Sequence, residues 1–249
     1  MFDFFDMFTF FSLMVGCCVG SFANVVIHRF SSGKSIVTPR SHCFSCGTNL
    51  KWRDMIPVIS WLMLKGRCRF CDATISKAYP IVEIVCALLF ALMATYLGAS
   101  LSVFPLWGLA FVLLSVAVID WKSLTIPDGL LIVGVISGLI WVGLSYGESK
   151  WVDAFFGIIA GALPLFLIDQ LVWILAKKPG FGFGDVKLMG MSGIFLGWQY
   201  VYIAFFVAFI MGGLWGAWLL ITKKAQRDNY IAFGPFLCFG ILVALLYSL

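Results

Sequence analysis

Long apolar stretches dominate this chain, and they restrict it more than any other feature to a helical membrane protein. Eight such stretches can be marked, each near the roughly 20 residues that a helix needs to cross a bilayer. They run over residues 7–27, 80–97, 101–120, 129–146, 154–175, 188–200, 201–221 and 231–248. The sixth is short, and its boundary with the seventh is the least defined. We therefore predict an all-α membrane protein with about eight transmembrane helices.

The overall composition agrees with this interpretation. The chain is 62% hydrophobic and 12% charged, whereas a soluble domain is about half apolar and about a quarter charged. The first stretch follows Asp3 and Asp6 and lacks the basic cluster of a cleavable signal peptide. We expect it to be a retained span with its N-terminus outside, because no Lys or Arg precedes Arg29.

The basic residues support one orientation. With the N-terminus outside, the cytoplasmic segments are 28–79, 121–128, 176–187 and 222–230, which hold 16 of the 17 Lys and Arg residues. Cytoplasmic loops carry such an excess, so the net charge of +5 is a topology signal. Nucleic-acid binding is not expected, because these residues are spread over loops that flank the membrane.

Residues 30–79 depart from the membrane pattern. They carry eight Lys and Arg residues and four cysteines, and are too few to bury a large core, so a cross-link or a metal is expected to hold them. We predict three parts: a first transmembrane helix over 1–29, a cytoplasmic zinc-binding domain over 30–79, and a helical bundle over 80–249. Short connections in the last part predict antiparallel neighbours.

Several apolar stretches carry pairs of glycines four residues apart. Such pairs let helix backbones approach closely in lipid, so we interpret them as packing sites. The pairs are Gly16/Gly20, Gly134/Gly138, Gly157/Gly161 and Gly212/Gly216.

The four cysteines of 30–79 form two C-x2-C units, Cys43/Cys46 and Cys68/Cys71, with 21 residues between them. This spacing is typical of a zinc ribbon, and four thiolates make a closed structural site. A dithiol–disulfide switch is the alternative, but a cytoplasmic loop lies in a reducing compartment, which favours metal.

The other metal-type side chains are weaker candidates. His42 precedes Cys43 directly and is not expected to be a ligand, and His28 ends the first span. The remaining cysteines lie inside apolar stretches and are expected to pack as small apolar residues. They are Cys17, Cys18, Cys86 and Cys238.

Two acidic residues lie at the ends of apolar stretches in informative surroundings. Asp120 closes the third stretch, and Ile126-Pro127-Asp128 follows, where the proline starts a helix. Asp185 opens the sixth within Gly182-Phe183-Gly184-Asp185-Val186-Lys187, where the glycines leave an open backbone. The predicted topology places both connections on one membrane face, so the two carboxylates can meet.

Two adjacent carboxylates cannot both ionise at low cost, so they share a proton. The charged one can take a proton from an attacking water, and the protonated one can donate to the peptide carbonyl and the leaving amine. Titration belongs to the pair, so neither acid has a fixed role. On spacing alone a second reading stays open, in which Asp120 and Asp185 are solvated loop-end acids or pair with Lys122 and Lys187.

Two further acids fall inside apolar stretches. Asp169 lies mid-span, where packing or a buried hydrogen bond is its expected fate, though a proton path stays open. Glu83 follows Tyr79-Pro80, and we place it in the first turn of a helix, where the helix dipole favours a carboxylate. Its proximity to the catalytic face keeps a functional role open.

Motifs spread over nearly the whole chain resemble those of bacterial type IV prepilin peptidases. Each match is weak alone, but their order and spacing together are specific. They are Gly20-Ser21-Phe22-Ala23-Asn24, Cys43-x2-Cys46, Asp54-x-Ile56-Pro57, Gly66-Arg67-Cys68-x2-Cys71, Tyr79-Pro80-x2-Glu83, Asp120 with Ile126-Pro127-Asp128, Gly182-x-Gly184-Asp185-x-Lys187, and Phe233-Gly234-Pro235-Phe236.

The resemblance implies a bifunctional enzyme of the bacterial cytoplasmic membrane. Such proteins remove the short basic leader of prepilins and pseudopilins at a Gly-Phe site on the cytoplasmic side. They then methylate the new N-terminal amine with S-adenosylmethionine. The resemblance carries the catalytic roles to Asp120 and Asp185, and zinc binding to Cys43, Cys46, Cys68 and Cys71. It assigns no residue to the methyl donor.

Two other functions fit parts of the pattern. Membrane acids and glycine-interrupted helices also suit an ion-coupled transporter, although transporter sites lie near the midplane. A zinc-bearing membrane scaffold without activity would leave a pilin precursor untrimmed. A basic leader also meets a basic inner face, which acids such as Asp54, Asp72 and Asp128 are expected to offset locally.

Overall fold

The computed structural model describes residues 4–31, 35, 38, 40–145, 148–177, 182–222 and 231–249. These residues form two compact units, 1–103 and 104–249, whose placement relative to one another is not determined. The described parts are almost entirely helical and contain no strand beyond two isolated β-bridges. The predicted all-α membrane fold is confirmed. The predicted three-part division at residues 29 and 79 is not tested and stays a prediction.

The first unit is a pair of long helices with a small non-helical segment between them in sequence. Helix α1 (Phe4–Ser31) packs along α3 (Ala78–Leu97), and the described residues of the segment between them include the short helices η1 (Trp52–Met55) and α2 (Ile59–Met63). The glycine pair of α1 makes close packing possible, because a Cβ on Gly16 would lie 2.6 Å from Ala87 Cα. The predicted packing role of Gly16 and Gly20 is confirmed.

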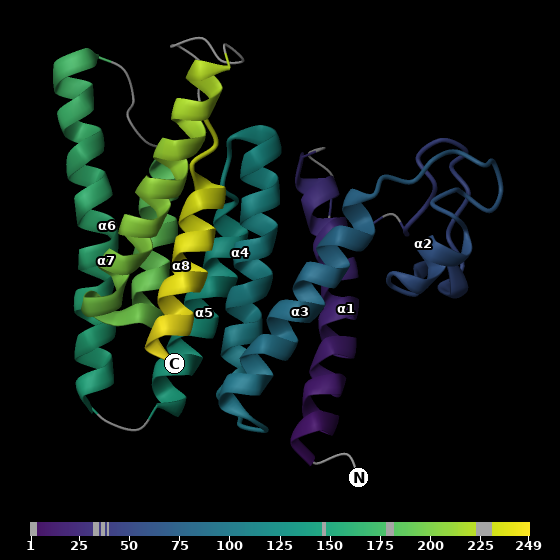
Figure 1. Ribbon diagram of the computed structural model, residues 1–249, viewed down its shortest axis with the longest axis horizontal. Coiled ribbons are helices and arrows are strands. Elements are labelled where there is room, and N and C mark those ends of the chain that lie inside the picture. The colour runs from purple at the N-terminus through teal and green to yellow at the C-terminus, as the bar shows by residue number, and fades with distance from the viewer. Residues whose placement is uncertain are drawn as a thin grey trace. The chain divides into compact units, whose positions relative to one another are not determined.

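The described residues of the second unit form a bundle of five helices (Figure 1). They are α4 (Val103–Ser123), α5 (Asp128–Leu144), α6 (Glu148–Ala176), α7 (Phe183–Ile221) and α8 (Gly234–Ser248). The glycine pair of α6 lies directly against α7, where a Cβ on Gly157 would collide with the Gly193 carbonyl. This contact allows the two backbones to pack at the short distance that small residues permit in lipid.

Helix α7 folds back on itself at Gly197, whose φ of 67° and ψ of 176° are not helical. The start of α7 carries Asp185, which lies near Asp120 of α4. Asp120 in turn contacts Gly234, the first residue of α8. Gly212, which lies on α7 after the break at Gly197, packs against Phe233, the residue before α8. Helix α7 therefore lies near the start of α8 both before and after the break. The arms 183–196 and 198–221 are the predicted sixth and seventh spans, and the break lies three residues before the predicted boundary.

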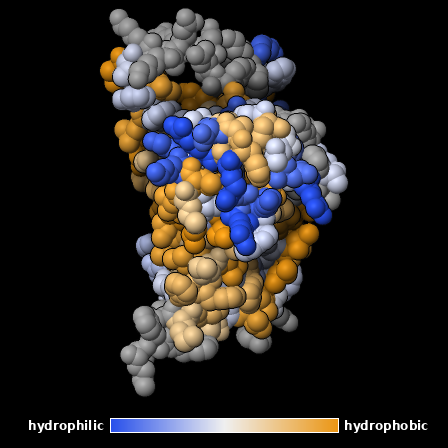
Figure 2. All heavy atoms as spheres, turned by 90° about the vertical axis from the view of Figure 1, so that its right-hand side faces the viewer, coloured by the Kyte–Doolittle hydropathy of each residue, from blue (hydrophilic) through white to orange (hydrophobic). Residues whose placement is uncertain are grey.

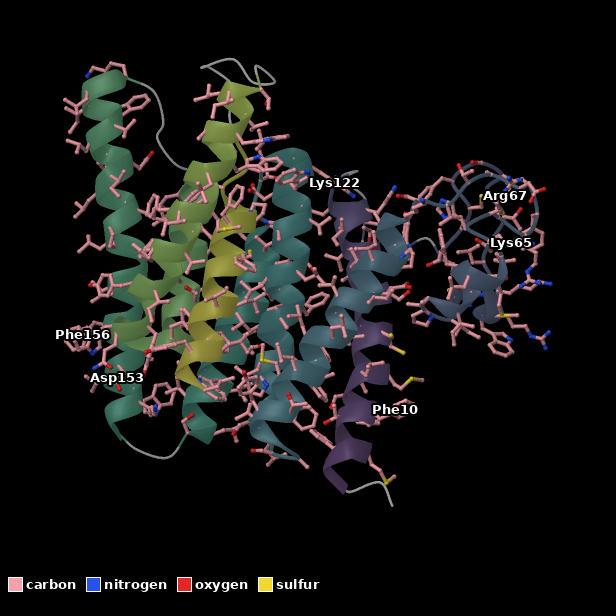
Figure 3. All side chains as sticks on the ribbon, viewed as in Figure 1. Phe10, Lys65, Arg67, Lys122, Asp153 and Phe156 are labelled. Atoms are coloured by element: carbon pink, nitrogen blue, oxygen red, sulfur yellow. The ribbon has the colours of Figure 1, made fainter. Side chains whose placement is uncertain are left out.

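Within the described residues, five helices are long and apolar enough to cross a membrane: α1, α3, α4, α6 and α7. Helices α5 and α8 are apolar but shorter. Many large apolar side chains face outward, such as Phe10 at 66% and Phe156 at 52% exposure (Figure 3). Lipid solvates such side chains, so their exposure is expected for a protein that crosses the membrane several times.

Candidate functional site

Asp120 is held near the end of α4 by the first residue of α8. Its side chain is 6% exposed. Its Oδ2 accepts a hydrogen bond of 2.9 Å from the Gly234 backbone N–H. A Cβ on Gly234 would lie 2.7 Å from this oxygen and 3.0 Å from Asp120 Cγ. Glycine is therefore needed for α8 to start against the carboxylate.

Asp185 is the third residue of α7 and is 8% exposed. Its Oδ2 accepts the Gly182 N–H at 3.2 Å, while its own N–H donates to the Gly182 carbonyl at 2.9 Å. This reciprocal pair caps the helix start. The other oxygen, Oδ1, is buried and has no hydrogen-bond partner among the described residues. A buried acceptor without a donor costs about 1–3 kcal/mol, so this atom has a strong tendency to take a proton or a water.

Two contacts hold the α7 start against the connection between α4 and α5. Gly184 lies so close to Ile126 that a Cβ on the glycine would be 2.9 Å from the Ile126 Cβ. One turn later, Lys187 Nζ forms a 2.8 Å ion pair with Asp128 Oδ1. These contacts join the two predicted acid motifs, and the Asp120 charge acts directly on the Asp185 carboxyl group. The structure thus brings the two predicted acids together at one end of the second unit.

The structure differs from the alternative reading of the two acids in two respects. Lys187 pairs with Asp128 rather than with Asp185. Both acids are buried, whereas loop-end acids would be solvated.

The structure also bears on the acids that were expected to offset the positive charge of the inner face near a basic leader. Asp54 forms a 2.7 Å ion pair with Arg69, and Asp128 forms one with Lys187. Both carboxylates therefore already have a basic partner within the protein.

The four loop cysteines lie together in the first unit. All four Sγ atoms are within 4.8 Å of one another, and Cys43 Sγ and Cys71 Sγ are 3.8 Å apart. Four sulfurs at about 2.3 Å from a central zinc would be about 3.8 Å from each other. The thiols therefore fit a tetrahedral zinc ion without rearrangement of the backbone.

Each C-x2-C unit forms the same tight turn. In the first, Cys43 N–H donates to Thr48 O at 3.0 Å and Gly47 N–H donates to Cys43 O at 2.9 Å. In the second, Cys68 N–H donates to Ala73 O at 2.8 Å and Asp72 N–H donates to Cys68 O at 3.0 Å. The fifth residue of each turn has a positive φ, 69° at Gly47 and 56° at Asp72. The turns aim both sulfurs of each unit at one point.

The backbone of the first turn also favours a thiolate. Hydrogen bonds from the backbone of Cys46 and of Ser45 lower the pKa of the Cys43 thiol to about 6. A thiol that ionises readily is a better zinc ligand, because only the thiolate binds the metal. Neither histidine joins the cluster, since His42 Nδ1 bonds to Arg40 O and the His28 ring stacks on Phe44.

Polar side chains gather on the cysteine-containing segment. Figure 2 faces this segment and shows hydrophilic side chains clustered on it, with apolar side chains among and below them. Lys65 and Arg67, labelled in Figure 3, lie on this segment. The distribution agrees with a segment that lies in water beside a membrane-crossing helix pair.

Two family models match the chain. Residues 14–97 match the bacterial peptidase A24 N-terminal domain, and residues 107–217 match the type IV leader peptidase family. The first match lies within the first compact unit and the second within the second unit. The chain belongs to the type IV leader peptidase family.

Curated members of this family match nearly the whole chain. A protein of Stutzerimonas stutzeri named prepilin leader peptidase/N-methyltransferase is 33% identical over 95% of this chain and 90% of its own length. Proteins of the same name from Aeromonas salmonicida and Pseudomonas aeruginosa are 34% and 30% identical, over 98% and 95% of this chain. No solved structure matches the chain.

The structure adds residues to this family member's acid site that the sequence reasoning missed. Gly234 was noted only as part of a motif, without the contact to Asp120. Cys238, interpreted as a packing residue, is 3% exposed and lies within electrostatic range of both acids. Its position one turn after Gly234 is the only sequence signal that could have indicated this.

Two other acids differ from the expectation or stay open. The prediction for Glu83 is wrong, because α3 begins at Ala78 and Glu83 lies in its second turn, beyond the usual reach of the helix dipole. Glu83 instead accepts a 2.7 Å hydrogen bond from the Val58 backbone N–H. Asp169 is half-buried on α6, and its expected role stays a prediction. The cytoplasmic segment predicted over 222–230 lies almost wholly outside the described residues.

Proposed function

We propose that this protein is a membrane-embedded aspartyl endopeptidase of the bacterial inner membrane. It removes the short basic leader from type IV prepilins and pseudopilins at a Gly-Phe site, and it then methylates the new N-terminal amine. The curated relatives carry the name of both activities. The buried pair Asp120 and Asp185, at the junction of α4, α7 and α8, would perform the cleavage.

One observation carries this assignment more than any other. Two carboxylates from positions 65 residues apart in sequence lie buried near one another, and one oxygen of Asp185 has no donor in the described structure. Burial of two interacting acids without a cation between them is costly unless they share a proton. An aspartyl protease needs that shared proton, whereas a purely structural site would be expected to pair each acid.

The chemistry follows from the sharing. The ionised member of the pair takes a proton from a water as the water attacks the scissile carbonyl, and the protonated member donates to the carbonyl oxygen. The proton then passes to the leaving amine. The Oδ1 of Asp185, which has no partner in the described structure, is available for the water or the carbonyl. The pair titrates as one unit, so the two roles are not divided between the acids.

The first arm of α7, residues 183–196, supports a site at the edge of the bilayer. It is shorter than the roughly 20 residues that span the hydrocarbon core, and Asp185 lies at its start. With the N-terminus outside, the acids face the cytoplasm, where the basic leader of a prepilin emerges from its membrane helix. The basic residues that flank the spans support this orientation.

A zinc ion at Cys43, Cys46, Cys68 and Cys71 would have a structural role. Four thiolates fill a tetrahedral zinc site and leave no position for substrate. S-adenosylmethionine supplies the methyl group as a sulfonium cation when it is bound.

A prepilin incubated with and without this protein tests the proposal by mass spectrometry of the pilin N-terminus. The wild-type protein should remove the leader and add one methyl group. Asp120→Asn and Asp185→Asn should each abolish leader removal and leave the membrane-inserted fold intact. Asp153→Asn is a matched control, because Asp153 lies near Gly197, at the opposite end of the second unit (Figure 3). Full cleavage by both single variants would refute the assignment.

A further inference from the structure

Three carboxylates are buried among the described residues, and the proposed cleavage uses only two of them. Asp120 and Asp185 lie in the second unit, at 6% and 8% exposure. The third, Glu83, lies on α3 of the first unit and is 7% exposed. Carboxylates within apolar helices are costly and are functional candidates by default.

Glu83 is the meeting point of three motifs that the cleavage reaction does not use. Its Oε2 accepts the Val58 N–H at 2.7 Å, and the Ser21 hydroxyl of α1 also donates to the carboxylate. Gly20 allows α1 to approach, because a Cβ there would lie 2.7 Å from Glu83 Cα. One turn further along α1, Asn24 Nδ2 donates to the Tyr79 carbonyl at 3.0 Å. These contacts fix the carboxylate between two membrane helices.

The backbone that Glu83 holds is strained. Val58 has a φ of 59° and a ψ of −52°, and the Ile59 N–H donates to the Pro57 carbonyl. This is a γ-turn of the positive-φ type, which is rare and strained, and a β-branched residue is unfavourable at its centre. Such strain is concentrated at functional sites. In this turn the Val58 N–H points to Glu83 and donates to it.

The surroundings of Glu83 leave it suited to a cationic ligand. Within the described part of the chain, Glu83 forms no ion pair, and the two hydrogen bonds occupy about half of the four lone-pair positions of a carboxylate. The titratable groups that face it are thiols, Cys17 on α1 and, next to that, Cys86 on α3. The Val58 turn contributes only its backbone. A primary ammonium group would supply the missing charge and donors.

We propose that Glu83 binds the α-amino group that leader cleavage creates and takes the proton that this group must lose before it is methylated. The inference rests on the proposed function, which supplies both the amine and the methyl donor. An ammonium nitrogen has no lone pair, so one proton must first pass from nitrogen to the Glu83 carboxylate. The nitrogen lone pair then forms the new N–C bond as the methyl C–S bond breaks, and that electron pair stays on the sulfur.

The test separates methylation from cleavage by using a synthetic peptide that begins with the mature N-terminal phenylalanine. With wild-type protein and S-adenosylmethionine, mass spectrometry should show one added methyl group. Glu83→Gln keeps the shape and can still accept from Val58 and Ser21, but it cannot take a proton. Methylation by this variant at pH 7 should fall by about 100-fold or more, as loss of a general base does. Leader removal from an intact prepilin should stay near the wild-type rate.

The pH profile tests the proton transfer itself. A free α-amino group has a pKa of about 8, so raising the pH above this value supplies neutral amine without a base. Methylation by Glu83→Gln should therefore recover as the pH rises, both in the wild-type background and with Cys17→Ser, which removes the facing thiol. Failure to recover would overturn the proposed role as proton acceptor.

A structural role for Glu83 makes a different prediction. If Glu83 only anchors the strained turn, Val58→Gly would relieve the strain, and the double variant Val58→Gly/Glu83→Gln would methylate normally. We expect it to stay inactive at pH 7. Without the donor, the free-amine peptide should bind the wild type more tightly than its N-acetylated form, and Glu83→Gln should lose that difference. Normal methylation by Glu83→Gln would refute the inference alone, whereas a wild type that transfers no methyl group would overturn the proposed second activity and the inference with it.

Discussion

The cysteine cluster and the acid pair are built in opposite ways. The four thiols come from residues 43–71, and backbone hydrogen bonds inside two equivalent turns aim them at one point. The acid site draws Asp120, Asp185 and Gly234 from three separate helices, and its geometry depends on contacts between helices. The cysteine cluster is thus a local site, specified by spacing along the chain. The acid pair is a remote site, formed by residues far apart in sequence, and it is specified by where side chains are small enough for helices to meet.

Among the variants that separate the acid site from the cysteine cluster, Gly234→Ala is expected to have the largest effect. The new Cβ would lie 2.7 Å from Asp120 Oδ2, so either α8 or the carboxylate must move. A displacement of about 1 Å at a catalytic group can cost about 100-fold in rate. Leader removal should fall by about that factor, measured as initial cleavage rate, while the metal content should not change.

Gly213→Ala is the matched control for this variant. Gly213 lies in the same unit, and a Cβ there would meet nothing within 4 Å. It should cleave at nearly the wild-type rate. If Gly234→Ala cleaved equally well, the remote site would not depend on this contact, and the contrast between the two regions would be lost.

The second effect is expected in the cysteine cluster. Cys68 is buried at 5% exposure, and its replacement by serine removes one of four thiolates. Metal analysis should show a fall from about one zinc per chain to almost none, because a structural site requires all four ligands. The segment around residues 40–77 should then become sensitive to proteases, since metal binding is coupled to folding in such small domains.

Cys18→Ser is the control, because Cys18 lies on α1 and outside the cluster. It should keep the metal. Retention of zinc by Cys68→Ser would contradict a four-thiolate site. Complete loss of leader cleavage on metal removal would show that the acid site depends on the cluster, and would break the separation drawn between them.

The same contrast explains what could be predicted from the sequence. The C-x2-C spacing predicts the cluster because the turns are local and their hydrogen bonds follow from a few residues. Asp120 and Asp185 were identified as candidates from the prolines and glycines beside them and from the predicted topology. The contact between Asp120 and Gly234 joins residues 114 positions apart, and nothing in the local pattern of either segment indicates it.

The errors have equally local causes. Glu83 was placed in the first helical turn because Pro80 was taken as the helix start, but α3 begins two residues earlier. The true partner, the Val58 N–H, is presented by a strained turn that no propensity rule predicts. The break in α7 was expected after residue 200, yet Gly197 can adopt the positive φ that the reversal needs.

A smaller effect should come from the ion pair that links the two acid motifs. Lys187 and Asp128 are partly exposed, at 40% and 67%, so the pair should contribute only about 0.2–1 kcal/mol. Asp128→Lys or Lys187→Asp alone should reduce cleavage by roughly twofold to fivefold if the pair positions the α7 start. The double charge swap should restore most of the rate.

The ion pair in the cysteine segment provides the control. Swapping the charges of Asp54 and Arg69, which pair at 2.7 Å, should leave cleavage unchanged. If the swap of Asp128 and Lys187 fails to rescue either single variant, their proximity does not position the acid site. The remote site would then depend on the packing of Gly184 and Gly234 alone.

The smallest effect should be the difference between the same substitution in the two cysteine turns. Both turns need a positive φ at the fifth residue, but the first uses Gly47 and the second uses Asp72. Gly47→Ala and Asp72→Ala place an alanine in the left-handed region, which costs about 1–2 kcal/mol relative to glycine and somewhat less relative to aspartate. Asp72→Gly should be nearly neutral, because glycine adopts the positive φ without steric strain but loses more conformational entropy on folding.

Competition with a metal chelator measures these differences as changes in zinc affinity. A Cβ on Gly47 would meet nothing within 4 Å, so any loss in Gly47→Ala comes from backbone conformation rather than from a collision. The loss of zinc affinity in Gly47→Ala can then be compared with the loss of cleavage rate in Gly234→Ala, where the same methyl group collides with a carboxylate. If Gly47→Ala weakened zinc binding no more than a substitution outside the turns, the positive φ would not be what holds the sulfurs together, and the cluster would depend on contacts beyond its own local turns.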